Sequence, residues 1–111
     1  VHAGVDIAVP VGTPVRAAGR GRVVFAAPRI VTGNTVIVEH LPGLYSIYMH
    51  LSKIQVRVGE VVERGRRIAL SGNTGLATGP HLHWELRAAG AAVDPDYWLE
   101  PSNWVPAPPL E

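Results

Sequence analysis

Two histidines stand two residues apart late in the chain, in the sequence His81-Leu82-His83. In an extended strand, residues i and i+2 project from the same face, so we expect His81 and His83 to point together. Leu82, Trp84 and Leu86 alternate with them and should fill the opposite, core-facing side. Imidazole nitrogens bind zinc and also exchange protons near neutral pH, so the pair predicts a metal site or an acid–base site.

Three more residues have side chains that zinc-dependent hydrolysis could use: His2, Asp6 and His50. Catalytic zinc sites usually take three nitrogen or oxygen ligands and leave a fourth position for water, whose pKa the metal lowers toward about 7. His2 and Asp6 can both reach one ion if Gly4 lets the chain bend. One histidine of the H-x-H would complete the set. His50 and the other H-x-H histidine would then act as general base, general acid or transition-state stabiliser.

Two further polar residues need an interpretation. His40 stands next to Glu39 and just before the Pro42-Gly43 turn, and we interpret it as an ordinary strand histidine outside the site. Glu85 shares the face of His81 and His83 by strand parity. It could orient a ligand imidazole from behind, or it could pair with an arginine.

Length and composition favour one compact domain without a polyanionic partner. The 111 residues carry a net charge of only +1, and the arginines are scattered, which argues against a nucleic-acid binder. No stretch approaches the roughly 18 apolar residues of a membrane span, and no signal sequence is present. The chain has no cysteine, so it can form neither a disulfide nor a thiolate zinc site, which fits an extracytoplasmic protein.

Short β runs separated by glycine and proline turns follow one another along the chain, and no stretch of about 12 residues shows a helical period. We therefore predict an all-β fold, an antiparallel sheet sandwich of barrel-sandwich type with a groove over the metal-bearing sheet. In the run 45–50, the alternation places His50 on the more polar face, together with Ser46 and Tyr48. The predicted strands are 5–8, 14–17, 21–26, 35–40, 45–50, 55–58, 67–71 and 81–87, and the predicted groove walls are 27–34, 41–45 and 73–80.

Three segments, in order along the chain, carry longer motifs. They are HAGVDIAVPVGTPV from His2 to Val15, YMHLS from Tyr48 to Ser52, and SGNTG with TGPHLHWEL between Ser71 and Leu86. They resemble the signatures of the LytM and lysostaphin-type zinc endopeptidases, and the similarity runs from His2 to about Tyr97. Several motifs in the right order are far more specific than any one of them.

This resemblance implies a bacterial cell-wall hydrolase that cuts peptide bonds in peptidoglycan stem peptides or cross-bridges. It implies that His2, Asp6 and His83 bind Zn²⁺ and that His50 and His81 are the catalytic pair. All five positions are filled, which favours an active enzyme, because degenerate relatives that activate other envelope machines typically lose one or more of them. Peptidoglycan peptides are the expected partners, and the expected location is the periplasm, the cell wall or the medium.

The resemblance also implies a division of the chain. Residues 1–100 would form the zinc endopeptidase domain. Residues 101–111 would be a Pro-rich C-terminal extension, because proline cannot donate to a strand ladder. The sequence begins at Val1 rather than with methionine, so we expect a piece of a longer protein with other domains.

Three other functions fit parts of the sequence. A non-catalytic envelope regulator, or an activator of a cell-wall amidase, could use the same scaffold. A biotinyl or lipoyl carrier has similar β units but needs a lysine on a tight hairpin, and the single lysine, Lys53, does not stand in such a turn. A structural zinc domain would add a fourth ligand, whereas this pattern leaves room for water. The sequence leaves open which peptide bond is cut and which of His50 and His81 is the base.

Overall fold

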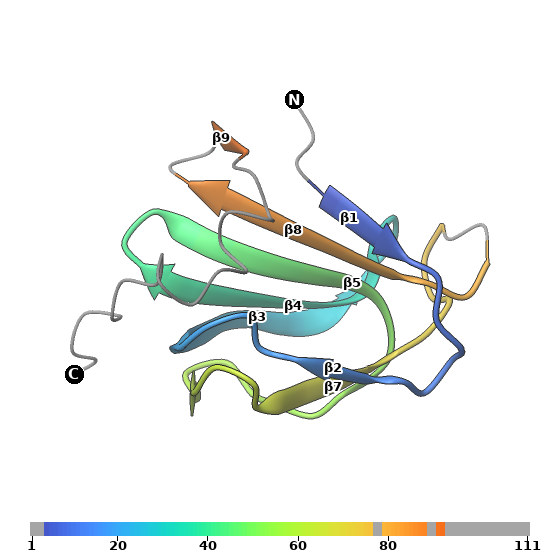
Figure 1. The fold of residues 1–111 in the computed structure, drawn as a ribbon, viewed down its shortest axis with the longest axis horizontal. Helices are drawn as coiled ribbons and strands as arrows, with labels where there is room; N and C mark the ends of the chain where they lie inside the picture. The colour runs from blue at the N-terminus through green and yellow to red at the C-terminus, as the bar shows by residue number, and fades with distance from the viewer. Residues whose placement is uncertain (1–3, 77–78, 89–90, 93–111) are drawn as a thin grey trace.

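Nine β-strands and no helix occur in residues 4–76, 79–88 and 91–92, the part of the chain that the structure, a computed structural model, describes. All the strand pairs among these residues are antiparallel, which confirms the predicted all-β class (Figure 1). The strands are β1 (Gly4–Ile7), β2 (Pro14–Arg16), β3 (Gly21–Arg29), β4 (Gly33–Leu41), β5 (Leu44–Ile54), β6 (Val61–Val62), β7 (Arg67–Ser71), β8 (Leu82–Ala88) and β9 (Ala91–Ala92).

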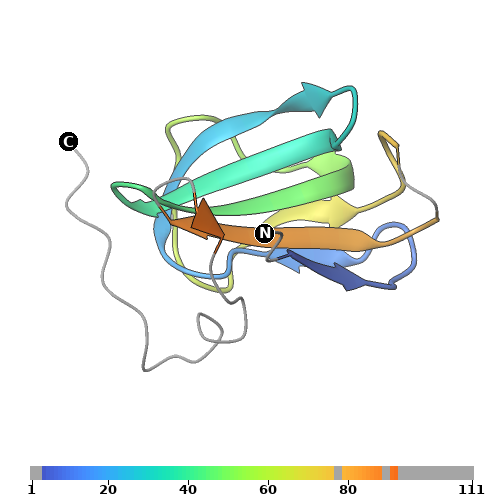
Figure 2. The ribbon, with the colours of Figure 1, turned by 90° about the horizontal axis from the view of Figure 1, so that it is seen from above.

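The strand β5 belongs to both layers of the fold. Its first part lies between β8 and β4, in a sheet with the order β1-β8-β5-β4-β3-β6. Its last residues, from Leu51 to Ile54, pair instead with β7, which in turn pairs with β2. Figure 2 shows β3, β4, β5 and β8 side by side, and Figure 1 shows β2 and β7 as a separate layer along this sheet. The bend in β5 therefore joins the two layers of the sandwich.

The hydrophobic core lies between these two layers. Val15 of β2 and Ile68 of β7 belong to the same buried cluster as Trp84 and Leu86 of β8. Trp84 is 7% exposed and Leu86 is 0% exposed, and Leu82 packs against the cluster, so the predicted parity of β8 is confirmed. Each fully buried side chain of this size contributes about 1.5–3 kcal/mol to folding. One face of β8 therefore anchors the strand, and the other face is available for polar residues.

A chain of buried polar groups runs through the core beneath β5. The hydroxyl of Tyr48 accepts a hydrogen bond from the backbone N–H of Ala18 (2.8 Å) and contacts Ser46 Oγ (2.8 Å), which contacts His40 Nε2 (2.7 Å). His40 Nδ1 reaches the carbonyl of Arg20 (2.8 Å). Because each polar side chain of this series has a hydrogen-bond partner, Ser46 and Tyr48 can face the core. The prediction that they share a polar face with His50 is therefore wrong. The placement of His40 outside the site is confirmed.

The predicted strand 55–58 is also wrong. Val56 is buried but Val58 is 64% exposed, although strand parity would place both on one face. The backbone N–H of Glu60 donates to the carbonyl of Arg57, the carboxylate of Glu60 accepts from the N–H of Arg57, and Gly59 adopts a φ of +94°. These hydrogen bonds close a turn that replaces the ladder, and pairing resumes only at β6.

Two predicted features lie outside the described residues: the zinc ligand His2 and the Pro-rich extension 101–111. In the part of the chain that the structure does describe, no helix is long and apolar enough to cross a bilayer.

Candidate active site

Neighbouring strands place Asp6 and His83 on one face of the main sheet. Asp6 of β1 stands directly opposite His83 of β8, and Met49 of β5 stands opposite His83 on the other side. Directly opposed residues project from the same face of a sheet, so the three side chains form a row across three strands. The next residue of β8, Trp84, points into the core, so His83 must point to the opposite face.

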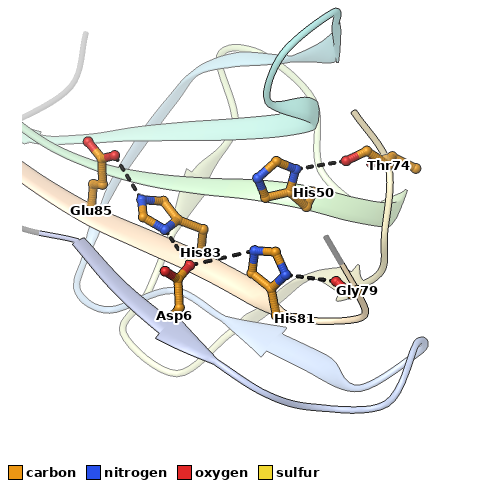
Figure 3. A network of polar contacts seen from close by, with 7 residues as sticks. All are labelled: Asp6, His50, Thr74, Gly79, His81, His83 and Glu85. Atoms are coloured by element: carbon orange, nitrogen blue, oxygen red, sulfur yellow. Dashed lines mark hydrogen bonds and ion pairs between the residues drawn. The ribbon is translucent and has the colours of Figure 1, made fainter. Parts of the chain in front are cut away.

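Asp6, His83 and Glu85 form one chain of polar contacts (Figure 3). His83 Nδ1 lies 2.6 Å from Asp6 Oδ1, and His83 Nε2 lies 2.8 Å from Glu85 Oε2. Burial favours the neutral ring, but the hydrogen bonds and the negative charges of Asp6 and Glu85 outweigh it and raise the pKa of His83 above its ordinary value. The side chain of Glu85 is 6% exposed and also accepts from Arg87 Nε at 3.0 Å. Glu85 therefore contacts both an imidazole and an arginine, so the predicted pairing with an arginine is confirmed, and a role in orienting a zinc ligand stays a prediction.

The rings of His50 and His81 lie beside each other, with centroids 5.0 Å apart and planes tilted by 55°. His50 Nδ1 lies 2.7 Å from the carbonyl oxygen of Thr74, and His81 Nδ1 lies 2.7 Å from that of Gly79 (Figure 3). A carbonyl can only accept, so each Nδ1 carries the hydrogen and the neutral ring keeps its lone pair on Nε2. His81 Nε2 is 3.5 Å from Asp6 Oδ1.

A β-bulge in β5 changes the direction of the His50 side chain. Between the pairs Asn34↔Leu51 and Val36↔Tyr48, β4 advances two residues while β5 advances three. His50 takes up the extra residue with a φ of +58°, which is uncommon for any residue other than glycine. As a result both Met49 and His50 line the cleft, although strict alternation would place them on opposite faces.

These side chains line an open cleft of about 350 Å³. Val31 and Thr32 of the β3–β4 turn and Leu76 after β7 form one wall, as expected for the loops 27–34 and 73–80. Val31 is 59% and Leu76 is 71% exposed, so this wall is apolar and accessible. The predicted third wall, 41–45, is wrong, because Leu44 pairs with Ala88 at the far end of β8. The lining residues are Asp6, Val31, Thr32, Met49, His50, Leu76, His81, His83 and Glu85.

A second hollow, of about 450 Å³, opens on the other face of β1 and β8. Its lining includes Val5, Ile7, Leu82 and Trp84 but no histidine or carboxylate. This hollow is the more apolar of the two, and its lining holds none of the predicted site residues, so the histidine-lined cleft is the candidate active site.

The donor set of the cleft suits a zinc ion. Within residues 4–76, 79–88 and 91–92, no three His, Cys, Asp or Glu side chains form a group that could hold a metal ion. The predicted third ligand, His2, lies outside these ranges. The two predicted ligands that are described, Asp6 and His83, present an oxygen and a nitrogen side by side, the donor types that zinc takes. Glu85 behind His83 matches the carboxylate–histidine arrangement common around zinc.

Two residues that contact His50 were not singled out by sequence. Thr74 supplies the carbonyl that accepts from His50 Nδ1, and the carbonyl of Thr32 accepts from the backbone N–H of His50 at 2.7 Å. Both act through backbone atoms, which any residue type carries. Only the position of Thr74 inside the SGNTG motif could have drawn attention to it.

Comparison with known proteins gives consistent matches. Residues 1–95 match the family described as Peptidase family M23. The peptidoglycan DD-endopeptidase ShyA of Vibrio cholerae is 50% identical over 93 residues, which cover 84% of this chain and 22% of that protein. The chain thus spans about a fifth of the length of the curated relatives that it matches.

Solved structures share the fold. The catalytic domain of the antimicrobial peptidase lysostaphin from Staphylococcus simulans matches with a TM-score of 0.81 and 38% identity, over 89% of this chain and 79% of that one. A zinc containing peptidase from Vibrio cholerae matches with a TM-score of 0.80 and 38% identity, over 96% of this chain and 31% of that one. These matches confirm the resemblance seen in the sequence motifs, and the chain belongs to peptidase family M23.

Proposed function

We propose that this chain is the zinc endopeptidase domain of a bacterial cell-wall hydrolase, acting on peptide bonds of peptidoglycan stem peptides or cross-bridges. The observation that carries the proposal is the arrangement in the cleft. The contacting pair Asp6 and His83 lies next to the ring pair His50 and His81, on one open face of the sheet. Two donors suited to a metal and two proton-transfer groups within one cleft are what metal-assisted amide hydrolysis needs.

Asp6 and His83 would hold the zinc ion together with His2. With His83 Nε2 directed at Glu85, Nδ1, which faces Asp6, would be the nitrogen that holds the ion. When bound, zinc supplies a Lewis acid that polarises the scissile carbonyl and makes water a stronger nucleophile at neutral pH. The buried carboxylate of Glu85 keeps the ring oriented and raises its basicity as a ligand.

His50 and His81 would manage the protons. With Nδ1 of each ring donating to a backbone carbonyl, Nε2 is the atom that can take a proton from water or return one to the departing amine. A protonated ring can instead donate a hydrogen bond to the oxyanion of the tetrahedral intermediate. The two rings divide these roles between them.

The cleft suits an extended peptide, because it is open to solvent and the exposed side chains of Val31 and Leu76 offer apolar contact. ShyA is named for cleaving DD bonds of peptidoglycan, which favours a cross-link between two D-configured residues as the substrate. Because peptidoglycan lies outside the cytoplasm, we propose an extracytoplasmic location for the domain. We assign the peptidase domain to residues 1–100 and a Pro-rich extension to 101–111. Because the relatives are about five times longer than the part that this chain matches, we also propose that the whole protein has other domains.

Incubation of the purified chain with chemically distinct peptidoglycans tests this function. We expect muropeptide fragments identifiable by mass spectrometry, no release after treatment with a chelator, and recovery when zinc is restored. A chain that carries zinc but releases nothing from any cross-linked peptidoglycan would refute the enzyme. Stimulation of a cell-wall amidase by such a chain would identify the alternative, a non-catalytic regulator on the same scaffold.

A further inference from the structure

The hydroxyl of Thr74 fills the gap that the bulge at His50 leaves in the β4–β5 ladder. Thr74 Oγ1 accepts from the backbone N–H of Asn34 at 3.1 Å and donates to the carbonyl of Leu51 at 2.7 Å. Asn34 and Leu51 are cross-strand partners on the flank of the bulge. A side chain from outside the two strands therefore connects a donor on β4 with an acceptor on β5, directly after His50.

The backbone of the same residue holds the imidazole of His50. The carbonyl oxygen of Thr74 lies 2.7 Å from His50 Nδ1, as Figure 3 shows. One residue thus fixes both the strand that carries His50, through its hydroxyl, and the ring of His50, through its carbonyl. The amide of Asn34 strengthens the same junction, because Asn34 Nδ2 donates to the carbonyl of Leu51 at 2.9 Å.

The position of Thr74 is itself tightly confined. A β-carbon added to Gly33 would collide with the backbone and hydroxyl of Thr74, so the two segments are in closest possible contact. His50 needs such support, because a non-glycine residue at positive φ is strained and persists only where its surroundings hold it. Loss of the hydroxyl would leave the N–H of Asn34 without this acceptor and let the bulge relax.

We propose that Thr74 is a positioning residue for the peptidase reaction: its hydroxyl holds the β5 bulge, and this keeps His50 where the carbonyl of Thr74 can fix its place and its tautomer. This inference rests on the proposed function. In this proposal Thr74 has no role in holding zinc. Loss of its hydroxyl should therefore change proton transfer and leave metal binding intact. It also predicts that serine, which keeps the hydroxyl, can replace threonine here.

The test compares Thr74→Val, Thr74→Ser and the wild type, all loaded with zinc. Valine keeps the shape but lacks the hydroxyl, and we expect kcat to fall about 10- to 100-fold with KM and zinc content nearly unchanged, since small misplacements of a reacting group have effects of this size. Thr74→Ser should stay within about threefold of the wild type. The matched control is Thr13→Val, which removes a hydroxyl that donates to the carbonyl of Pro10 and contacts no residue of the cleft; its kcat should not change.

A second readout does not depend on turnover. In nitrogen NMR of the imidazole rings, His50 should show a hydrogen fixed on Nδ1 in the wild type and Thr74→Ser, and a mixture of tautomers or faster exchange in Thr74→Val. An unchanged His50 signal and unchanged kcat in Thr74→Val would overturn the proposal, and so would a loss of zinc with the loss of kcat. If the wild type cleaves no peptidoglycan, the proposed function fails, and the His50 signal alone still decides the role of Thr74.

Discussion

The imidazole rings of His50 and His81 lie 5.0 Å apart, and each donates its Nδ1 hydrogen to a backbone carbonyl of the segment that joins β7 to β8. One connecting segment therefore orients both rings, although His50 belongs to β5 and His81 stands directly before β8. The support of Asp6 and His83 is different, because these two residues contact each other and His83 contacts Glu85, and the link between the two pairs is the 3.5 Å approach of His81 Nε2 to Asp6 Oδ1. The first two predictions below test whether the two pairs have different roles.

Replacing a predicted zinc ligand should remove metal and activity together. In His83→Ala, Asp6→Ala and His2→Ala, one of three ligands is lost, so bound zinc and peptidoglycan hydrolysis should fall in parallel. Elemental analysis of the purified variants, beside hydrolysis assays, measures both. If His83→Ala kept its zinc while His81→Ala lost it, the roles within the H-x-H would be reversed.

Replacing a ring of the catalytic pair should leave the metal in place. His50→Ala and His81→Ala should each retain about one zinc per chain but lose turnover by a factor on the order of 100 to 10,000, the usual contribution of a general acid or base. The same zinc and hydrolysis measurements apply. Full activity in His50→Ala would contradict the proposed mechanism.

Glu85 should tune zinc affinity through His83. Glu85→Gln keeps the size of the side chain but removes the charge facing His83 Nε2, and we expect zinc to bind about 10- to 100-fold more weakly, as is typical when such a supporting group is lost. Competition with a chromogenic chelator gives the affinity. Glu39→Gln, on the same sheet but outside the cleft lining, is the matched control. Equal affinity in both variants would mean that Glu85 serves Arg87 alone.

Trp84 should be a structural residue. It is 7% exposed and belongs to the core cluster, so Trp84→Ala should lower the free energy of unfolding by about 3–5 kcal/mol, the usual effect of emptying a large aromatic site. Urea denaturation followed by circular dichroism measures the change. Ile30→Ala, at a residue 89% exposed, is the control and should unfold like the wild type. A Trp84→Ala protein as stable as its parent would contradict the strand parity of β8.

The buried His40 should make the fold sensitive to mild acid. Burial lowers the pKa of His40 below its ordinary value of 6.5, against the opposing effect of the Arg20 carbonyl. The unfolded chain therefore takes up a proton as the pH falls below 6.5 while the folded chain does not, and the free energy of unfolding decreases across the interval down to the lowered pKa. Above pH 6.5 this contribution is fully present.

His40→Gln isolates this contribution. Denaturation of the variant and the wild type at several pH values between about 5 and 8 gives the difference between their pH dependences. The contributions of zinc and of His83 are common to both proteins and cancel. We expect the wild type to lose more stability than His40→Gln below pH 6.5, and parallel curves would contradict the assignment.

Much of the site could be predicted because β8 is a regular strand. The alternation of His81 and His83 with Leu82, Trp84 and Leu86 reflects one face in the core and one face in the cleft, and simple parity describes both. The motifs added Asp6 and His50 from other strands. Their pairing across the sheet follows from the register that the structure shows.

What parity could not predict arises where the backbone departs from a regular strand or where polar groups are satisfied in the core. Ser46 and Tyr48 are polar in sequence yet buried, because His40 and the backbone of Ala18 complete their hydrogen bonds. His50 faces the cleft because its φ is positive, and the sequence gives no sign of this because the residue is not a glycine. In each case a decisive partner lies outside β5, so the alternation within that strand carries no information about it.

The close contact of Gly33 with Thr74, and of Gly75 with Val31 and Gly33, has a consequence for protein engineering. Backbone atoms of the β3–β4 turn contact backbone atoms of the segment after β7. A change in the length or sequence of one segment therefore requires a matching change in the other. A graft meant to change which peptide the cleft accepts must transplant both segments as one unit. Exchange of a single loop would displace His50, because the carbonyls of Thr32 and Thr74 in these two segments accept hydrogen bonds from it.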